Sequence, residues 1–379
     1  MEAFASPDMT TQNKRGFVVL GGVGAIGRVV VRDLFESQRR NHILIADYNA
    51  AAADAYARSF RSRRVTTAFA DAGQIKRLVK ILQGHAVVIN CTQHDFNLCV
   101  MQAALLAKVH YIDLGGLFSW TRKQLKLHRQ FKRTGLTAIL GAGCSPGITN
   151  VMTRAAVDLL DRIESVRIRV GARDFNAKPD GFFFPYSAQT IVEELTLAPW
   201  VFERGKFREV KPRAGWEQVR FPQPVGPQWV VRTRHSEVAT IPLSFGSRGL
   251  VFCDFKVSFD REFVREVVKR LKDGWTVRDF AKLPTPRSHS NDYEISRVIV
   301  RGKKKMITVD CHARANRRWH ASAGDVDTGC PPSIVAQMVA TGLIEERGVL
   351  APEKAVPVEP FFGELRKRGM RIVMKESGL

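Results

Sequence analysis

The sequence predicts an α/β protein in which a Rossmann dinucleotide-binding domain is joined to an α+β domain built on a mostly antiparallel sheet. In the first 150 residues, short apolar runs alternate with helical patterns, which is typical of a parallel sheet with crossover helices. From about residue 163 to 320, short alternating runs follow one another closely, with two amphipathic helical stretches among them, which favours antiparallel pairing. Because 379 residues are too many for one hydrophobic core, two domains are expected.

The stretch GFVVLGGVGAIGRVVVRDLFES carries a glycine motif between an apolar run and a helical pattern. Gly22 allows a tight turn, Gly24 lets the backbone approach a pyrophosphate, and Gly27 lets the helix pack close to the strand. The free N–H groups of the helix N-terminus then face the phosphates. The turn residues expected to bind the dinucleotide are Gly22, Val23, Gly24, Ala25, Ile26 and Gly27.

A second strand pattern, NHILIADYN, ends in Asp47, 20 residues after Gly27. A carboxylate at this spacing accepts hydrogen bonds from the adenosine ribose hydroxyls and repels a 2′-phosphate. No arginine follows Asp47 immediately, so NAD is favoured over NADP as the cofactor. The alternative is a glycine turn in some other βαβ unit.

Ligands of an open parallel sheet bind at the carboxyl ends of its strands, so the residues that follow each later strand are candidates for the site. One such strand ends in YIDLGG, and the next leads to GAGCSPGITN, where Ser145 and Pro146 predict a helix start. The further cofactor contacts expected at these strand ends are Tyr48, Asp71, Ala72, Cys91, Thr92, Gln93, Leu114, Gly115 and Cys144.

In the second half, SAQTIVEELT and DREFVREVVKRLKDG predict helices. The stretch TRHSEVATIP lies between strand patterns, and strand alternation would turn His235 and Glu237 to the same face. Proline and glycine punctuate residues 211–228, as in a loop or lid. Near the end, Asp327 or Thr328 is expected to cap a helix over SIVAQMVATGLI.

The composition, 45% hydrophobic and 25% charged, is that of a soluble globular protein. No apolar run approaches the length of a membrane span and the N-terminus lacks the apolar core of a signal peptide, so a cytoplasmic protein is expected. Six scattered cysteines without a CxxC pair predict reduced thiols and no metal site. The net charge of +22 is spread along the chain without a nucleic-acid-binding motif, and it predicts a solubilising surface with no specific nucleic-acid partner.

Longer motifs resemble the saccharopine dehydrogenase family along nearly the whole chain: GGVGAIGRVV, YIDLGG, GAGCSPGITNV and DTGCPPSIVAQMVATGLIEERGVLAPE. Within it, the middle block is most similar to the lysine 6-dehydrogenase subgroup, through PYSAQTIVEELTLAPWVFERGKFREVKPRAGWE, FPQPVG and HSEVATIPLSF. The resemblance implies NAD-dependent oxidation of the ε-amine of L-lysine to an imine. Hydrolysis would release ammonia and give 2-aminoadipate 6-semialdehyde, which cyclises to piperideine-6-carboxylate.

The resemblance also implies that the C-terminal segment returns to the nucleotide domain, so that the α+β domain is an inserted one and supports contacts in a homo-oligomer, a dimer or tetramer. The expected division is an N-terminal arm at 1–15, the Rossmann domain at 16–150, the inserted substrate-binding and oligomerisation domain at 151–322, and the returning segment at 323–379.

An ε-ammonium must lose a proton before it releases hydride, and water must then attack the imine, so the reaction needs a general base near neutral pH. His235 is the candidate base, oriented by Glu237, and the alternative is an exposed pair on an edge strand. Asp113 would contact the nicotinamide ribose or the amine, and the alternative is a turn-capping aspartate. The substrate contacts expected are Tyr186 on the pocket wall, Arg173 for the α-carboxylate and Gly116 beside the nicotinamide.

Three other functions are compatible with the sequence. A saccharopine-type reductase would form or cleave a secondary amine, usually with NADPH, which Asp47 disfavours. A dehydrogenase of another amino acid or of a diamine is the second. A nucleotide-sensing or nucleic-acid-binding module without turnover is the third, supported only by the net charge of +22.

Overall fold

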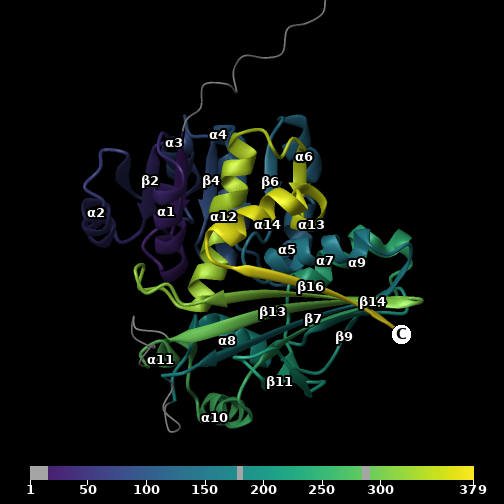
Figure 1. Ribbon diagram of the computed structural model, residues 1–379. Helices are drawn as coiled ribbons and strands as arrows, with labels where there is room; N and C mark the ends of the chain where they lie inside the picture. The colour runs from purple at the N-terminus through teal and green to yellow at the C-terminus, as the bar shows by residue number, and fades with distance from the viewer. Residues whose placement is uncertain (1–15, 177–181, 284–290) are drawn as a thin grey trace, which may run out of the picture.

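The computed structural model describes residues 16–176, 182–283 and 291–379, so the expected arm at 1–15 lies outside the described residues. Two sheets lie at opposite ends of the molecule, and helices between them join the two (Figure 1). The predicted fold class is confirmed: a parallel Rossmann sheet comes first and a second, mixed sheet follows it.

The first sheet has seven parallel strands in the order β15-β6-β5-β4-β1-β2-β3. Its strands are β1 (Phe17–Leu20), β2 (Ile43–Asp47), β3 (Val65–Phe69), β4 (Val87–Asn90), β5 (His110–Asp113), β6 (Thr137–Ile139) and β15 (Gly348–Leu350). The connecting helices are α1 (Ala25–Ser37), α2 (Ala50–Ser59), α3 (Ile75–Leu82), η1 (His94–Phe96), α4 (Asn97–Ala107), α5 (Phe118–Leu125) and α6 (His128–Arg133). The strand order reverses between β1 and β4, and ligands of such sheets bind at the carboxyl ends beside this point.

The second sheet runs in the order β10-β11-β12-β7-β13-β14-β16, with β8 paired to β12 and β9 paired to β8. Its strands are β7 (Ile163–Asp174), β8 (Trp200–Glu203), β9 (Lys206–Glu209), β10 (Glu217–Arg220), β11 (Pro227–Arg232), β12 (Phe252–Ser258), β13 (Asp292–Gly302), β14 (Lys305–Arg314) and β16 (Arg371–Gly378). Among these described strands β7 and β12 pair in parallel and the other pairs are antiparallel. The helices of this half are α7 (Ile148–Asp158), α8 (Ala188–Thr196), α9 (Glu237–Phe245), η2 (Gly246–Arg248), α10 (Arg261–Lys272) and α11 (Val277–Phe280).

The C-terminal part of the chain contributes to both sheets. Helix α12 (Ala323–Ala340) packs on α1, and β15 extends the first sheet beside β6. After α13 (Pro352–Ala355) and α14 (Val358–Lys367), strand β16 pairs with β14 of the second sheet (Figure 1). The part of the C-terminal segment that packs with the Rossmann domain therefore extends from α12 to α14. Its last strand, β16, belongs to the second sheet.

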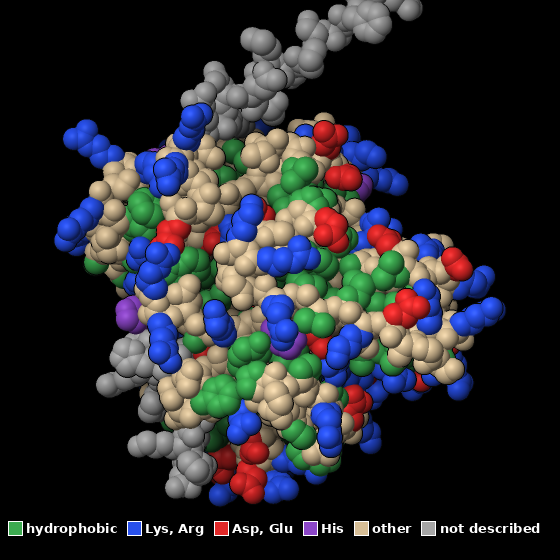
Figure 2. Space-filling view, in the orientation of Figure 1, with side chains coloured by type: hydrophobic (Ala, Val, Ile, Leu, Met, Phe, Trp, Pro, Cys, Tyr) green, Lys and Arg blue, Asp and Glu red, His purple; other side chains and the backbone are tan. Residues whose placement is uncertain are grey.

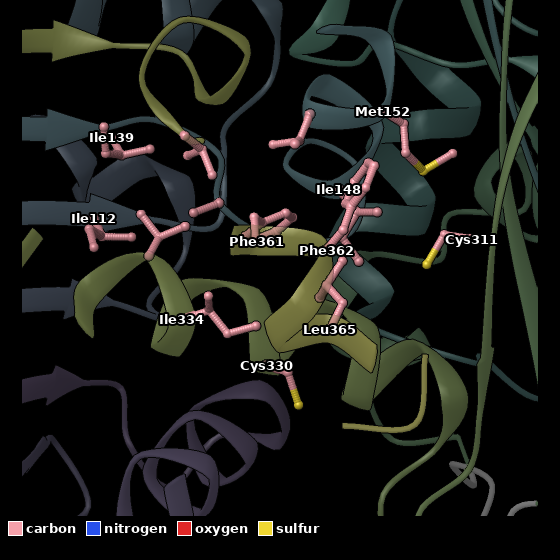
Figure 3. Close-up of a cluster of buried hydrophobic side chains, with 14 of the residues drawn as sticks. Ile112, Ile139, Ile148, Met152, Cys311, Cys330, Ile334, Phe361, Phe362 and Leu365 are labelled. Carbon is pink, nitrogen blue, oxygen red and sulfur yellow. The ribbon is translucent and has the colours of Figure 1, made fainter. Parts of the chain in front are cut away.

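One hydrophobic core connects the two halves. Phe361, Phe362 and Leu365 of α14 belong to the same buried cluster as Ile148 and Met152 of α7, and the close-up shows these two groups side by side (Figure 3). Strand residues of the first sheet and inward residues of the second sheet complete this cluster. Because burial of apolar surface is the main stabilising term, this continuous core fixes the two sheets relative to each other.

The prediction that TRHSEVATIP has strand geometry is wrong. Strand β11 ends at Arg232, Ser236 occupies the N-cap position, and residues 237–245 form helix α9. The Ser236 hydroxyl makes no cap hydrogen bond, whereas the glutamate in the first turn of α9 is favourable at the positive end of the helix dipole. His235 and Glu237 are therefore brought together by a helix start and not by strand alternation.

Two predicted helix starts are also displaced. Helix α7 begins at Ile148 after Gly147, later than the start expected at Ser145. Helix α12 begins before the predicted cap, because Ser322 and Asp325 form a capping box in which each side chain accepts the other's backbone N–H at 3.0 Å. Asp327 consequently lies inside the helix.

No helix among the described residues combines the length and the apolar character needed to cross a lipid bilayer. On the face in Figure 2, lysine and arginine side chains are scattered over elements of both halves, in keeping with the spread of charge in the sequence.

Candidate active site

The glycine turn between β1 and α1 leaves no room for larger residues. A Cβ atom on Gly27 would lie 2.2 Å from the carbonyl oxygen of Gly21, and one on Gly22 would lie 2.9 Å from that of Val19. At Gly24 the nearest atom would be 3.4 Å away, and no carboxylate stands in the first turn of α1. The turn and the free helix N-terminus therefore fit a dinucleotide pyrophosphate.

Asp47 closes this turn from the end of β2. Its Oδ2 accepts the N–H of Val23 at 3.0 Å, and its Oδ1 accepts the N–H of Asn49 at 2.9 Å. A carboxylate oxygen has two lone-pair sites, so each oxygen retains one for a ribose hydroxyl.

The edge of the sheet beyond Asp47 offers an aromatic surface for an adenine ring. Tyr48 is 72% exposed, and its ring centroid lies 5.4 Å from that of Phe69. Asp71 accepts the N–H of Gly73 at 2.9 Å and so stabilises its own turn, while Ala72 is buried beneath it.

Residues 91–93 follow β4 on the other side of the glycine turn. A Cβ on Gly21 would lie 3.0 Å from the carbonyl group of Cys91, so the two loops are in close contact. Thr92 donates its hydroxyl to Asn90 Oδ1 at 2.6 Å, and Gln93 precedes η1. The expected cofactor residues of this loop therefore border the turn.

Asp113 holds loops together and has no free lone pair. Its Oδ1 accepts the N–H groups of Gly115 (2.9 Å) and Gly141 (2.7 Å), and its Oδ2 accepts from Tyr111 Oη (2.9 Å) and Gln124 Nε2 (2.6 Å). Burial raises the pKa of this carboxyl despite these donors. The predicted contact of Asp113 with a ribose or an amine is therefore corrected. Asp113 instead positions the loops that follow β5 and β6.

The glycines after Asp113 are tightly packed. Gly115 has φ +108°, and a Cβ there would lie 2.6 Å from Pro146 Cγ. A Cβ on Gly116 would lie 3.1 Å from that of Trp120 and 3.4 Å from that of His94. Gly116 is thus enclosed by side chains at the crevice edge.

A thiol and two carboxyl groups meet where three elements converge. Cys144 lies in the loop after β6, Glu294 on β13 and Asp327 on α12, and their ligand atoms all lie within 4.8 Å of one another. The Cys144 thiol lies 3.1 Å from Ser296 Oγ and donates toward Glu294 Oε1 at 3.7 Å.

Both carboxyl groups of this cluster have raised pKa values. Burial raises the pKa of Glu294 to about 7, and the neighbouring Asp292 carboxylate adds to the rise. Burial and the charge of Glu294 raise the pKa of Asp327 well above its usual range. Because two carboxylates this close do not both ionise readily, the pair retains one shared proton near neutral pH.

His235 is held between two carboxylates. Its Nδ1 lies 2.7 Å from Glu237 Oε2 and its Nε2 lies 3.6 Å from Glu194 Oε1, while its ring stacks on Phe255 at 3.7 Å. Burial alone would lower the pKa of His235, but the two carboxylates outweigh it and raise the pKa to about 9. A pKa of about 9 favours the imidazolium near neutral pH, which suits a role of His235 in orienting carboxylates better than the predicted role of general base.

The two clusters adjoin. The Thr149 hydroxyl donates to Glu237 Oε1 at 2.9 Å and lies 3.4 Å from the carbonyl oxygen of Cys144. Tyr186 donates its hydroxyl to Glu194 at 2.5 Å, and the residue is 40% exposed.

The combined cleft has a surplus of negative charge. Glu194, Glu237 and the Glu294–Asp327 pair, which shares one proton, face one imidazolium, and within the described residues the ion pairs of these acids are with His235 alone. Uncompensated carboxylates at such a site attract cations.

Arg173 does not join the cleft. Ala172 pairs with Glu294 in the β7–β13 register and Arg173 pairs with Tyr293, so Arg173 lies on the opposite face of the sheet from Glu294. Its guanidinium donates to the carbonyl of Pro224 at 3.4 Å.

Comparison with known proteins accounts for nearly the whole chain. Residues 17–139 match the family described as the saccharopine dehydrogenase NADP binding domain, and residues 143–370 match the saccharopine dehydrogenase C-terminal domain. The chain belongs to the saccharopine dehydrogenase family. The family prediction is thereby confirmed, and with it an oxidoreductase that has an NAD(P)-binding domain.

Named relatives share about a quarter of the sequence of this saccharopine dehydrogenase family member. Carboxyaminopropylagmatine dehydrogenase of Synechocystis is 26% identical over 93% of this chain and 96% of its own. Carboxynorspermidine synthase of Vibrio alginolyticus is 26% identical over 79% of this chain and 80% of its own. The L-Glu-forming saccharopine dehydrogenase of Saccharomyces cerevisiae has the same fold, with a TM-score of 0.75 at 15% identity over 96% of this chain and 100% of that one.

Several residues of the cleft were not predicted. Glu294 lies within a strand pattern and Asp327 was assigned to a helix cap, so neither indicated a site. Glu194 belonged to an ordinary amphipathic helix pattern. A sequence could have offered one sign of these residues, an acidic residue with no basic residue close to it in the chain. This sign points to a site only when the fold is known, because the fold brings the acidic residues together.

Proposed function

We propose that this saccharopine dehydrogenase family member is an NAD(P)-dependent oxidoreductase that forms or cleaves the carbon–nitrogen bond of a secondary amine in a carboxylated, polycationic substrate. The observation that carries the proposal is the surplus of carboxylates in the cleft, of which Glu194, Glu237 and Asp327 are buried. Buried carboxylates need cationic partners, and a substrate with several ammonium or guanidinium groups supplies them. The relatives at 26% identity are named for carboxyaminopropylagmatine and carboxynorspermidine.

The ε-amine of L-lysine is the substrate that the resemblance of the middle block implies. Lysine carries two ammonium groups and one carboxylate, a net charge of +1. The cleft offers four carboxyl groups against one imidazolium, which suits a substrate of higher positive charge better. In addition, Arg173, the residue expected to bind the lysine carboxylate, lies on the other face of the sheet.

The reaction transfers a hydride and a proton. A carbonyl compound and a primary amine condense with loss of water to an imine, which becomes a secondary amine when its carbon gains a hydride and its nitrogen gains a proton. In the reverse direction the hydride and the proton are removed, and water then hydrolyses the imine and breaks the carbon–nitrogen bond. The dinucleotide, when bound, supplies or accepts the hydride. We assign the proton to the Glu294–Asp327 pair, which acts as the acid toward the imine and as the base toward the amine.

The remaining cleft residues position this pair and the substrate. The imidazolium of His235 fixes Glu237 and Glu194 by its two ring nitrogens. Tyr186 holds Glu194 from the mouth of the pocket. Burial and the nearby carboxylates raise the pKa of the Cys144 thiol, so it stays neutral and packs beside the pair.

We propose NAD as the preferred cofactor. Asp47 stands at the ribose position with a lone pair free on each oxygen, and a 2′-phosphate would be repelled there. The nearest arginine of the turn, Arg28, donates to the carbonyl of Val23 at 2.9 Å and lies over the ring of Tyr56 at 4.5 Å. Arg28 is thus already engaged by the protein.

A substrate panel tests the proposal. The full-length protein is incubated with carboxynorspermidine, carboxyaminopropylagmatine or L-lysine, each with NAD or NADP, and the absorbance of the reduced cofactor and the release of ammonia are measured. A carboxylated polyamine should be oxidised without ammonia release, at a kcat/KM at least about tenfold above that of lysine. Oxidation of lysine with one ammonia per reduced cofactor, while the secondary amines are inert, would instead establish a lysine 6-dehydrogenase.

A further inference from the structure

We propose that a groove along helix α10, outside the cleft, binds a compact polyphosphate anion of the nucleoside triphosphate class. The groove has a volume of about 610 Å³, which lies in the range of small-molecule sites. It is formed by α10 and the segment before β10, and it is lined by Pro212, Arg213, Trp216, Arg261, Val264, Arg265, Val268, Lys269 and Lys272.

All charged residues of the lining are cations. The lining contains five cations and no aspartate or glutamate. Arg261, Arg265 and Lys269 follow one another at intervals of four residues, so they lie on one side of α10 and repel each other. Glu266, on another side of the helix, is paired with Arg270 at 2.6 Å and does not compensate them. A bound anion would remove this repulsion.

The floor of the groove is apolar and aromatic. Trp216, Val264 and Val268 provide this surface. The guanidinium of Arg261 lies 3.9 Å from the ring centroid of Trp229 and 5.2 Å from that of Trp216, which restricts its motion. A row of cations beside an apolar surface that includes a tryptophan favours a ligand that combines phosphates with a ring, as a nucleotide does.

The extent of the cationic row favours a compact ligand. Helix α10 has 12 residues, which corresponds to a length of roughly 18 Å. The row begins at Arg261 and ends at Lys272, the first and last residues of this helix. A few consecutive phosphates can occupy this length, whereas a nucleic-acid strand would extend beyond it.

The groove is distinct from the candidate active site. Val264 and Val267 of α10 pack in one cluster with Ile191 and Leu195 of α8, and Glu194 of the same helix contacts His235 in the cleft. One helix therefore separates the two sites, and variants of the groove leave the residues of the cleft unchanged.

Calorimetry with the full-length protein tests the proposal. Saturating NADH is present in every titration, so that phosphates are not bound at the glycine turn. The titrants are ATP, inorganic tripolyphosphate, adenosine and a single-stranded DNA oligonucleotide. The groove variant is K269E/K272E, and the matched control is K303E/K304E, which changes the net charge equally at two exposed lysines between β13 and β14.

ATP and tripolyphosphate should bind to the wild-type protein, ATP more tightly because of its ring, and adenosine should not bind measurably. The groove variant should weaken ATP binding by at least about tenfold, and the control by less than about twofold. Equal weakening in both variants would reveal nonspecific attraction by the net charge and overturn the proposal. Binding of DNA alone, or of adenosine as tightly as ATP, would overturn it as well.

Discussion

Glu294 has a pKa of about 7, and a group of this kind titrates in the range where the enzyme would operate. As the base toward an amine it must be deprotonated, so oxidation should lose kcat/KM below pH 7, and reduction should lose it above pH 7. E294Q should abolish both of these pH-dependent losses of kcat/KM, and it should lower kcat by at least about a hundredfold. The pH profiles of kcat/KM in both directions measure this. An unchanged pH profile in E294Q would show that another residue causes the pH-dependent losses of kcat/KM.

The same residue affects stability. A carboxyl whose folded pKa is raised favours the folded state at pH values below its ordinary pKa near 4.5, and this contribution is lost as the pH rises through about 7. E294Q should therefore raise the unfolding free energy at pH 8 by about 2 kcal/mol and have little effect at pH 4.

His235 has a pH dependence of the same sign, at higher pH. Its pKa of about 9 exceeds the ordinary value of 6.5, so its contribution is complete below pH 6.5 and disappears as the pH rises through about 9. H235Q leaves Glu237 and Glu194 buried without their cation, and it should cost about 3 kcal/mol of unfolding free energy at pH 6 and less at pH 10. Denaturant unfolding at both pH values measures the difference. Adding E194Q should restore part of the loss, and a cost independent of pH would contradict this assignment.

At the scale of elements, sequence patterns located the glycine turn, Asp47 and the two amphipathic helices, because these depend on local spacing. They missed α9 and placed the start of α12 too late. Pro242 lies within α9, and Pro331 and Pro332 lie within α12, although proline is unfavourable inside a helix. Tertiary packing of buried residues along both helices outweighed the lost backbone hydrogen bonds, and such packing has no local signal.

The glycine turn provides a test of the nucleotide site. G27A places a Cβ 2.2 Å from the carbonyl oxygen of Gly21, which displaces the turn. The affinity for NADH, measured by calorimetry, should fall by at least about tenfold. G363A makes the same chemical change in α14, where a Cβ meets nothing within 4 Å, and should leave the affinity unchanged. If G27A bound NADH as tightly as the wild-type protein, the dinucleotide would not bind at this turn.

At the scale of the whole molecule, the return of the chain completes the cleft. Asp327 reaches the site only because α12 packs on α1, and the Asp33 carboxylate of α1 binds Arg368 of α14 at 2.6 Å and Ser333 of α12 at 2.6 Å. No pattern in the sequence indicated this connection, because its residues are about 300 positions apart in the chain.

D33N tests whether this connection stabilises the assembled molecule. Asp33 and Arg368 are both buried, so removal of one charge leaves the other uncompensated and should cost about 3 kcal/mol of unfolding free energy. The matched control is D158N, which breaks the exposed pair with Arg154 and should cost less than about 1 kcal/mol. Similar costs in denaturant unfolding would show that the buried pair has no special role.

The acidic cleft is the site at which we expect a cationic amine to react. A crystal structure of the protein with its dinucleotide and a carboxylated polyamine tests this expectation most directly. The secondary nitrogen should lie within hydrogen-bond reach, about 2.6–3.2 Å, of Glu294 or Asp327, with a second positive group of the ligand beside Glu194. A secondary nitrogen bound at His235, with no ligand atom near Glu294 and Asp327, would contradict the assignment of the reacting site.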